Sequence, residues 1–400
     1  MAMMVAKVMM RMKTNRRILG IALIVVFLLT LSLGGYTQDT WLTYFEGDEY
    51  GALLDVALVG ESDFIAVGAT NHRHFPPLIS DALAMRVGLD GTVVWERTWG
   101  GTGFEQAHAI APTTDGNLII FGETTSIGAG DRDFTLQKIT PDGEELWTHT
   151  YGTAFMEKPF GMTGLGNGDV LIYGLTTSPA GRREAQYAVR VDGDGSVLWE
   201  HTAETAEEEL IIDAIETQDG AIVLSVVING MDDGMLVKLD AAGDEIWSVR
   251  YELENHQYAA SIAQTDDGFL LAGFELPASG IRQADVWLAR TTSEGDLLWE
   301  KTFGDPHSDD YAVRLLRLAD GDYLIGGLGE RIALFKITES GDVVWEQRLG
   351  TAGGHIAYSL TELPDGGFLV SGMKTLINGR SYDIVLMRTD ALGQTSSQDP

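Results

Sequence analysis

The sequence predicts an all-β fold, a seven-bladed β-propeller of four-stranded antiparallel blades, from three features that recur along its 400 residues. The first is the motif Gly-x-x-x-Trp, which ends at Trp95, Trp147, Trp199, Trp247, Trp299 and Trp345. The second is a lone cation nine residues before each tryptophan, namely Arg86, Lys138, Arg190, Lys238, Arg290 and Lys336, with Arg388 as a seventh member. The third is an Asp-Gly turn followed by a short apolar run. Self-similarity with a period of about fifty residues indicates a repeat architecture.

One repeat, residues 107–151, shows how the strands are predicted. Residues 107–114 alternate roughly between apolar and polar side chains and end at the tight-turn dipeptide Asp115-Gly116. The apolar run 118–122 has the length of a buried strand. A polar loop leads to a third strand at 134–139, and the turn Asp142-Gly143 leads to a fourth at 145–151. Four short strands joined by hairpin turns predict one antiparallel sheet.

The ends of the chain predict how the ring closes. The first three strands of the repeat occur seven times, but the fourth strand with its tryptophan occurs only six times. Residues 39–46 contain Trp41 and, four residues later, an aromatic residue as in the other fourth strands. This segment is therefore expected to be the outer strand of the last blade, which removes exposed sheet edges. The expected blades are 53–99, 107–151, 160–203, 211–251, 259–303, 312–349 and 357–393 plus 39–46, within a domain 36–393, and 394–400 is expected to be a disordered tail.

The pattern Lys/Arg-x-x-x-x-Gly-x-x-x-Trp, followed by Asp-Gly and an apolar run ending in Gly, resembles exported bacterial and archaeal β-propeller repeat proteins. Their blades are similar to those of the quinoprotein (PQQ-like) dehydrogenases, and the resemblance covers residues 39–393. It implies that the turn between the third and fourth strands and the tryptophan dock neighbouring blades. It implies no recognisable cofactor site, so no cofactor is expected, and the fold alone does not fix a function.

The tryptophans (Trp41 included) and the seven cations are interpreted as blade architecture, because a residue repeated in every blade serves the blade. The Lys or Arg stem is expected to cover the tryptophan face in a cation–π contact while the charge reaches water or a carbonyl.

The N-terminus predicts export. Lys13, Arg16 and Arg17 precede an apolar run from Ile18 to Leu33, so residues 1–35 are expected to be a signal peptide or an uncleaved membrane anchor. The protein is then secreted, or held at the cell surface or in a periplasm, on the far side of the membrane. The chain has no cysteine, which excludes disulfides, thiolate metal sites, a cysteine nucleophile and lipid attachment through cysteine.

The chain is strongly acidic, with a formal net charge of −32. Residues 1–35 hold five of the 27 basic residues and no acid, which leaves 22 basic against 59 acidic residues, a net charge of −37. Such a field repels nucleic-acid phosphates, so no nucleic-acid partner is expected. The acidity is interpreted as a solubility feature, and adaptation to high salt stays open.

Candidate binding residues are sought where the repeats differ, because loops on a rigid scaffold carry function. These candidates are the loop residues His72, Arg73 and His74 and, on connections of the same face, Glu105, His256, Asp309 and His355. His72 and His74 have the spacing of a metal pair in an extended segment, but an ordinary polar loop explains them too, so no metal site is assigned. No catalytic residue is assigned either, since no nucleophile motif or phosphate-binding loop is present.

These observations favour an exported, non-enzymatic, monomeric propeller that acts as a binding or interaction scaffold for an unknown protein, peptide or glycan. Two alternatives remain. One is a PQQ-like quinoprotein dehydrogenase, of the kind that uses His, Arg and calcium rather than paired cysteines. The other is a propeller hydrolase or lyase that acts on polysaccharide.

Overall fold

The computed structural model describes residues 40–45, 50–70, 79–177, 183–203, 205, 207–229, 233–251, 255–276, 284–304, 309–351, 353–375 and 382–396. The chain divides into two units, Met1–Gly35 and Tyr36–Pro400. The expected signal peptide or anchor, residues 1–35, lies outside the described residues, as does the end of the expected tail. Within the described part of the chain, no helix combines the length and the apolar character needed to cross a membrane.

The described part of Tyr36–Pro400 contains only strands, turns and irregular segments, so the all-β expectation is confirmed. Twenty of the strands form five four-stranded antiparallel sheets, each made of consecutive strands. They are β2 (Tyr50–Val59), β3 (Asp63–Thr70), β4 (Ala82–Gly88) and β5 (Val93–Trp99); β6 (Glu105–Pro112), β7 (Leu118–Thr124), β8 (Asp133–Ile139) and β9 (Glu145–Tyr151); β10 (Glu157–Gly164), β11 (Val170–Thr177), β12 (Glu184–Val191) and β13 (Val197–Ala203); β14 (Glu209–Glu216), β15 (Ile222–Ile228), β16 (Asp233–Leu239) and β17 (Glu245–Tyr251); and β18 (His256–Gln264), β19 (Gly268–Leu276), β20 (Asp285–Thr292) and β21 (Leu297–Phe303). The strands expected between residues 107 and 151 match β6–β9 to within two residues.

The remaining strands form one eight-stranded sheet. It contains β22 (Tyr311–Arg317), β23 (Tyr323–Gly329), β24 (Ile332–Ile337) and β25 (Val343–Leu349), and then β26 (His355–Glu362), β27 (Phe368–Thr375), β28 (Tyr382–Thr389) and β1 (Trp41–Phe45). The two halves are joined by only two residue pairs, Leu328–Ile356 and Gly329–His355, between β23 and β26.

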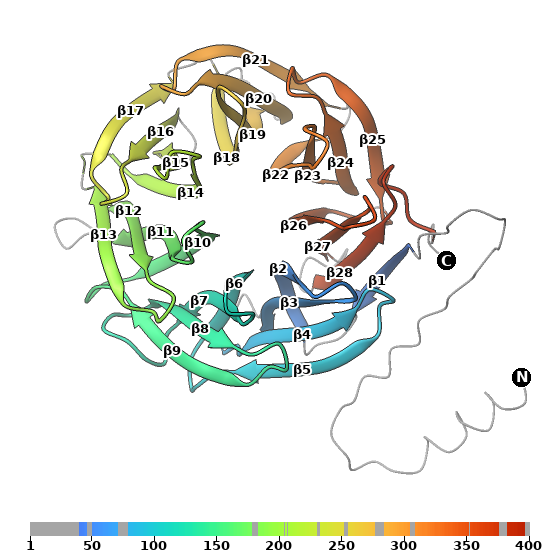
Figure 1. Ribbon diagram of the computed structural model, residues 1–400. Helices are drawn as coiled ribbons and strands as arrows, with labels where there is room; N and C mark the ends of the chain where they lie inside the picture. The colour runs from blue at the N-terminus through green and yellow to red at the C-terminus, as the bar shows by residue number, and fades with distance from the viewer. Residues whose placement is uncertain are drawn as a thin grey trace, which may run out of the picture. The chain divides into compact units, whose positions relative to one another are not determined.

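The sheets stand side by side around a central axis (Figure 1). The first strand of each group of four (β2, β6, β10, β14, β18, β22 and β26) lies nearest the axis, and the last lies on the outer rim. This radial arrangement of antiparallel sheets is that of a β-propeller.

Strand β1 pairs antiparallel with β28, although more than 330 residues separate them in the sequence. Trp41 lies opposite Arg388, and this register is the one that every other motif tryptophan has with its cation, as for Trp95 opposite Arg86 and Trp147 opposite Lys138. The N-terminal strand thus occupies the same place in its sheet as β5 or β9 does in its own.

The hydrophobic core of the described residues is divided into seven clusters, each filled by two neighbouring groups of strands. The cluster between β2–β5 and β26–β28, for example, packs Leu53, Phe64 and Met85 against Leu369 and Leu386. The second and third strands are buried on both faces, which explains their continuous apolar runs.

The motif glycine and the motif tryptophan meet between sheets at six of the seven joints, whereas Gly195 lies against His149 and Tyr151. Gly91, Gly143, Gly243, Gly295, Gly341 and Gly393 all have positive φ values, between 72° and 89°, and all lie against the tryptophan of the preceding group. A Cβ on Gly243 would lie 2.8 Å from the indole of Trp199, so a larger residue would push the sheets apart. The indole Nε1 atoms of Trp41, Trp95 and Trp199 donate to carbonyls of the same turns, at 2.9, 3.2 and 3.1 Å.

The motif cations join the same turns. Each pairs with a carboxylate in the first hairpin turn of its own group, in the pairs Arg86–Asp63, Lys138–Asp115, Arg190–Asp169, Lys238–Asp219, Arg290–Asp267, Lys336–Asp320 and Arg388–Asp365. Four of them also donate to a turn carbonyl of the next group, at 3.1 to 3.2 Å. The expectation that the charge reaches a carbonyl is confirmed for these four.

The expected cation–π contact differs from what the structure has. The cations over Trp95 and Trp299 are Arg97 and Lys301, two residues further along the same strands, rather than the motif residues Arg86 and Arg290. The motif cations turn to the hairpin carboxylates because a charge-assisted hydrogen bond is stronger than a contact with a ring face.

Replacing Trp41 by alanine is expected to lower the free energy of unfolding by about 3–5 kcal/mol, the usual loss for a large buried aromatic side chain. Trp41 is 5% exposed, packs in a cluster with Phe64 and hydrogen-bonds to Leu89. Chemical denaturation measures the change. The matched control is Leu146→Ala, which removes a side chain that is 49% exposed on the rim and is expected to change stability by less than about 0.5 kcal/mol. Equal losses for the two variants would contradict the packing described here.

Candidate functional site

Each of the seven innermost strands carries a β-bulge at the same place. The pairing with the second strand shifts by one residue between Leu53 and Asp55, and equivalently in every other group. The extra, unpaired residues are Leu54, His108, Phe160, Ile212, Ala260, Val313 and Tyr358. A bulge bends its strand and re-aims a side chain, and bulges are common beside binding sites.

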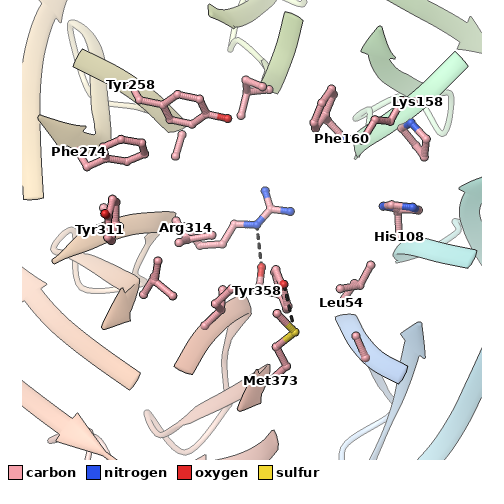
Figure 2. A pocket seen from close by; sticks show the side chains of 18 of the residues that line it. Leu54, His108, Lys158, Phe160, Tyr258, Phe274, Tyr311, Arg314, Tyr358 and Met373 are labelled. Carbon is pink, nitrogen blue, oxygen red and sulfur yellow. Dashed lines mark hydrogen bonds between the residues drawn. The ribbon is translucent and has the colours of Figure 1, made fainter. Parts of the chain in front are cut away.

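All seven bulge residues line one pocket of about 630 Å³ on the axis of the ring, and Figure 2 shows most of its lining. This volume lies in the range of about 300–1,000 Å³ that is typical of ligand sites. The other lining residues are Ala52, Gln106, Lys158, Pro159, Tyr258, Phe274, Tyr311, Ala312, Arg314, Leu328, Ile356 and Met373. We call this pocket the axial channel. It draws at least one side chain from every innermost strand.

A glycine on the second strand makes room for the bulge. A Cβ on Gly174 would lie 2.0 Å from the carbonyl oxygen of Lys158, and Gly68, Gly122, Gly273 and Gly372 meet the equivalent carbonyl. In the two remaining groups the register gives this position to Gly327 and Val226, which pair with Ala312 and Ile211. The glycines thus serve the close approach of two strands within one sheet.

Two buried carboxylates tie the bulges together behind the channel wall. Asp55 accepts hydrogen bonds from the Ser359 hydroxyl (2.6 Å) and from the Ile110 N–H (2.9 Å), which belong to the two neighbouring groups. Asp213 accepts in the same way from Tyr173, Ser261 and the Ile262 N–H, at 3.0, 2.7 and 3.0 Å. Burial raises the pKa of Asp55, and these donors oppose the rise.

Arg314 places a positive charge in the channel. It follows the bulge residue Val313 on β22, and its side chain is 30% exposed, with the guanidinium directed toward the middle of the pocket (Figure 2). Its Nε atom donates to the carbonyl oxygen of Tyr358 at 2.9 Å, and Nη1 lies 3.8 Å from Asp213. Burial lowers the pKa of Arg314. The nearby Asp213, Tyr173 and Asp55 raise this pKa by more than burial lowers it, so the guanidinium stays charged.

One side of the channel is an aromatic wall. The rings of Tyr258 and Phe274 stack with centroids 4.9 Å apart, and Phe274 meets Tyr311 edge-on at 4.7 Å.

On the opposite side of the channel, the Lys158 ammonium lies 5.5 Å from the ring centroid of Phe160. His108 faces the channel and contacts Glu123, which is buried and also binds Arg132. The wall therefore offers flat apolar faces beside isolated cations.

Glu105, one of the expected binding residues, holds its own loop. It is the first residue of β6, is 8% exposed, and accepts from the Gly101 N–H and the Thr124 hydroxyl at 2.8 and 3.0 Å. Glu157 and Glu209, the first residues of β10 and β14, bind their preceding loops in the same way. Glu105 is thus part of a repeated structural contact.

The other expected residues lie at or just before the start of an innermost strand, each in a different group. His256 begins β18 and is exposed, His355 begins β26 and is buried beside the Glu330 carbonyl, and Asp309 binds the Ala284 N–H just before β22. The structure thus distributes these three residues over three groups rather than gathering them in one cluster. His72, Arg73 and His74 lie outside the described residues. Within the described ranges, no group of three His, Asp or Glu side chains could hold a metal ion.

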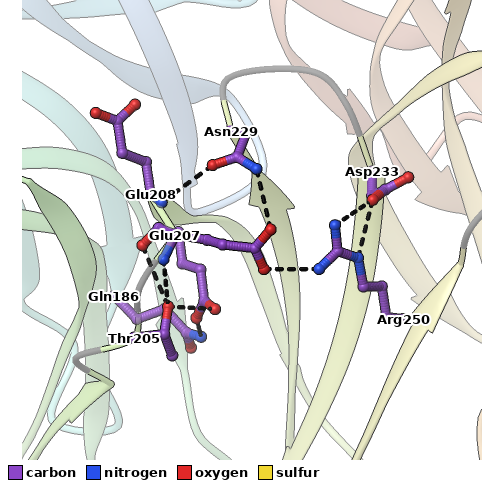
Figure 3. A network of polar contacts seen from close by, with 8 residues as sticks. Gln186, Thr205, Glu207, Glu208, Asn229, Asp233 and Arg250 are labelled. Carbon is purple, nitrogen blue, oxygen red and sulfur yellow. Dashed lines mark hydrogen bonds and ion pairs between the residues drawn. The ribbon is translucent and has the colours of Figure 1, made fainter.

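The acidic run before β14 forms a polar network at the rim (Figure 3). Glu207 accepts from Arg250 at 2.7 Å and from Asn229 at 3.1 Å, and Arg250 also binds Asp233. Hydrogen bonding from Arg250 lowers the pKa of Glu207. Glu209 accepts from Thr205 and Gln186. These partners fix the loop, so the network is structural.

The channel residues were missed at the sequence level, although a signal was present. Six of the bulge residues stand at one constant spacing before Asp115, Asn167, Asp219, Asp267, Asp320 and Asp365, the first residues of the turn dipeptides. The motif tryptophan, cation and turn glycine are repeated, whereas this position holds seven different residues. Sequence reasoning looked for variation in loop length and not at a single strand position.

Comparison with known proteins supports the fold. No protein-family model matches the sequence, and none of the curated proteins is similar to it in sequence. Among solved structures, YCF48 bound to D1 peptide matches with a TM-score of 0.53 at 12% identity, over 89% of this chain and 96% of its own. The polysaccharide lyase Uly1 matches with 0.51 at 10%, over 90% and 94%. The α-L-arabinofuranosidase Arb93A of Fusarium graminearum matches with 0.51 at 12%, over 70% and 91%. At these identities the likeness shows a shared β-propeller fold alone.

Replacing Gly174 by alanine is expected to destabilise the protein by about 1–3 kcal/mol, because the new Cβ would overlap the Lys158 carbonyl and disturb the bulge. Gly164→Ala, in the same sheet, is the control: nothing lies within 4 Å of its Cβ position and its φ is not positive, so the change is expected to be neutral or slightly stabilising. Denaturant unfolding of both variants is the measurement. A neutral Gly174→Ala would refute the account of the bulge.

Burial raises the pKa of Tyr258 to about 12. A phenol in the unfolded chain ionises near pH 10, so the folded state keeps a proton that the unfolded state has lost. This contribution to stability is present below pH 10 and is expected to be lost as the pH rises toward 12. The absorbance of tyrosinate near 295 nm, recorded as wild type minus Tyr258→Phe, should show one group titrating near pH 12. A midpoint near pH 10 would mean that Tyr258 is solvated.

Proposed function

We propose that the protein is an exported, non-enzymatic β-propeller scaffold that binds a protein or peptide partner in the axial channel, outside the cell or at its envelope. The single observation that carries this proposal is the set of bulge residues. A repeating framework directs seven different side chains, Leu54 and His108 through to Tyr358, into one ligand-sized cavity. Specific recognition requires side chains that differ from one another on a rigid framework, and the repeated part of the strands supplies that framework.

We propose further that the ring has seven blades, with the eight-stranded sheet counted as two. The two residue pairs between β23 and β26 are few beside the full registers within each half. The seven clusters of the core and the pairing of β1 with β28 support a ring closed by the N-terminal strand. Such closure leaves no open end in the ring of sheets, which suits a monomer.

The lining favours binding over catalysis. Hydrolysis of glycosidic bonds uses two carboxyl groups that flank the bond, and calcium prefers oxygen ligands. The described lining of the channel has no carboxylate, and the nearest ones, Asp55 and Asp213, face donors inside the wall. A polysaccharide-acting hydrolase or lyase and a PQQ-like dehydrogenase remain the alternatives. The polysaccharide lyase Uly1 and the α-L-arabinofuranosidase Arb93A, which have a similar fold, are enzymes of the first kind. YCF48, which also has a similar fold, is bound to D1 peptide.

Export remains part of the proposal on the strength of the N-terminal sequence. Basic residues followed by the apolar run Ile18–Leu33 fit a signal peptide or anchor, and a chain without cysteine has no thiol to oxidise in an oxidising compartment. No cofactor or metal is assigned. The acidic surface suits a soluble monomer, and the proposed partner carries little negative charge overall.

Ala260→Trp is expected to block the channel and to lower capture of the partner from an envelope extract by about tenfold or more. Ala260 is a bulge residue on the channel wall, so a large side chain there enters the pocket. The control is Leu298→Trp, on an outer strand where Leu298 is 54% exposed, which is expected to leave capture unchanged. Quantitative mass spectrometry of the captured proteins is the readout, with thermal melts to show that both variants are folded.

Two results would overturn the proposal. One is undiminished capture by a folded Ala260→Trp variant. The other is turnover by the wild-type protein, seen as dye reduction with calcium and pyrroloquinoline quinone, or as release of reducing ends from a polysaccharide.

A further inference from the structure

We infer that the axial channel recognises the free C-terminal carboxylate of an apolar peptide end, with Arg314 as the group that binds the carboxylate. This inference rests on the proposed function and names the ligand chemistry of the same site. It follows from the kind of cation in the channel, from the surface around it, and from the charge of the whole molecule.

The guanidinium of Arg314 is suited to a carboxylate. Its Nε atom is held by the Tyr358 carbonyl, which fixes the plane of the group, and the far side of the guanidinium is turned into the pocket (Figure 2). A planar guanidinium presents paired N–H donors that match the two oxygens of a carboxylate. Asp213, at 3.8 Å, keeps the group charged but lies beyond hydrogen-bond distance.

The surroundings of Arg314 strengthen this interaction. The aromatic wall of Tyr258, Phe274 and Tyr311 lies beside it and excludes water from one side. An ion pair in such an environment is less screened than one on the surface. The other basic lining groups are Lys158 and His108, the remaining titratable ones are the phenols of Tyr258, Tyr311 and Tyr358, and no Asp or Glu belongs to the described lining.

An apolar peptide end fits the lining better than a sugar acid does. Twelve of the nineteen lining residues are apolar, and His108 and Gln106 are already held in the wall. A sugar would place several hydroxyl groups against this mainly apolar lining, and each one left unpaired costs about 1–3 kcal/mol. Leu, Val or Phe side chains next to a terminal carboxylate would instead pack against the wall.

The charge of the protein argues against a polyanion. The sequence carries a net charge of −32, so a polyuronate or a run of acidic residues would be repelled before it reached the channel. A single terminal carboxylate on a neutral chain meets little of this repulsion and finds the cation inside. The volume of about 630 Å³ suits a few terminal residues rather than a folded surface.

The experiment compares peptides that differ only in the terminal charge. The probes are acetylated tetrapeptides whose last two residues are each Phe, Leu or Val, prepared with a free carboxylate and as the C-terminal amide. Isothermal titration calorimetry with the full chain is expected to show at least one free acid binding ~10-fold or more tightly than its amide, the range for a charge-assisted hydrogen bond.

Variants assign the discrimination to Arg314. Arg314→Gln is expected to bring acid and amide to within about twofold of one another, and Arg314→Lys to retain part of the difference. The control is Arg97→Gln, on the outer rim over Trp95, which is expected to keep the full difference. Arg314 also holds Tyr358, so folding of its variants is checked by circular dichroism.

A measurement on the wild-type protein covers the case in which Arg314 variants do not fold. The free-acid peptide is expected to protect Arg314 from modification by phenylglyoxal, as mapped by mass spectrometry, whereas its amide and trigalacturonate are not. Equal binding of acid and amide, protection by trigalacturonate, or no binding of any tetrapeptide would each overturn the inference. The proposed function would survive these results if Ala260→Trp still abolished capture of a protein, and would fall with them if it did not.

Discussion

The contact between a tryptophan on the rim of one group of strands and the turn glycine of the next holds the ring together. The positive φ of that glycine lets the turn lie flat on the indole, as Gly243 does on Trp199. The cation opposite the tryptophan then links a carboxylate of its own group to a carbonyl of the neighbour, as Arg190 does. The same contact recurs between β1 and the turn at Leu89, so the N-terminal strand is held by the same kind of interaction as the others.

Because these contacts lie toward the outer rim, the residues that face the axis of the ring can differ from one group of strands to the next. The innermost strands bulge at one position, where a glycine such as Gly174 on the second strand accepts the displaced carbonyl. Asp55 and Asp213 lock neighbouring bulges to each other, so the side chains on the channel wall are presented by a rigid backbone. A preorganised wall loses little entropy when a ligand binds, which is an advantage for a site with few polar contacts.

The outer surface of the molecule and the wall of the axial channel differ in charge. The motif cations pair with hairpin carboxylates and stabilise the contacts between neighbouring groups of strands. The excess of acidic residues remains on the outer surface. In the channel the balance is reversed, since Arg314 and Lys158 line it and no carboxylate does among the described residues. The net charge of the whole chain is therefore negative, whereas the charged side chains among the described channel lining are basic.

The sequence by itself determined the all-β class and the strands, because hydrophobic runs and Asp-Gly turns act between residues close in sequence. The sequence also predicted that the strand of Trp41 pairs with the last blade, because only that blade lacked a fourth strand of its own. Only the tertiary structure decided the axial channel and the position of Arg314 beside Asp213, about one hundred residues away in sequence. The bulge that aims Phe160 or Tyr358 inward depends on a carbonyl displaced against a neighbouring strand, and no local pattern of side chains records that displacement. The structural role of the loop candidate Glu105 likewise depends on the fold, because one of its two partners, Thr124, comes from the neighbouring strand β7.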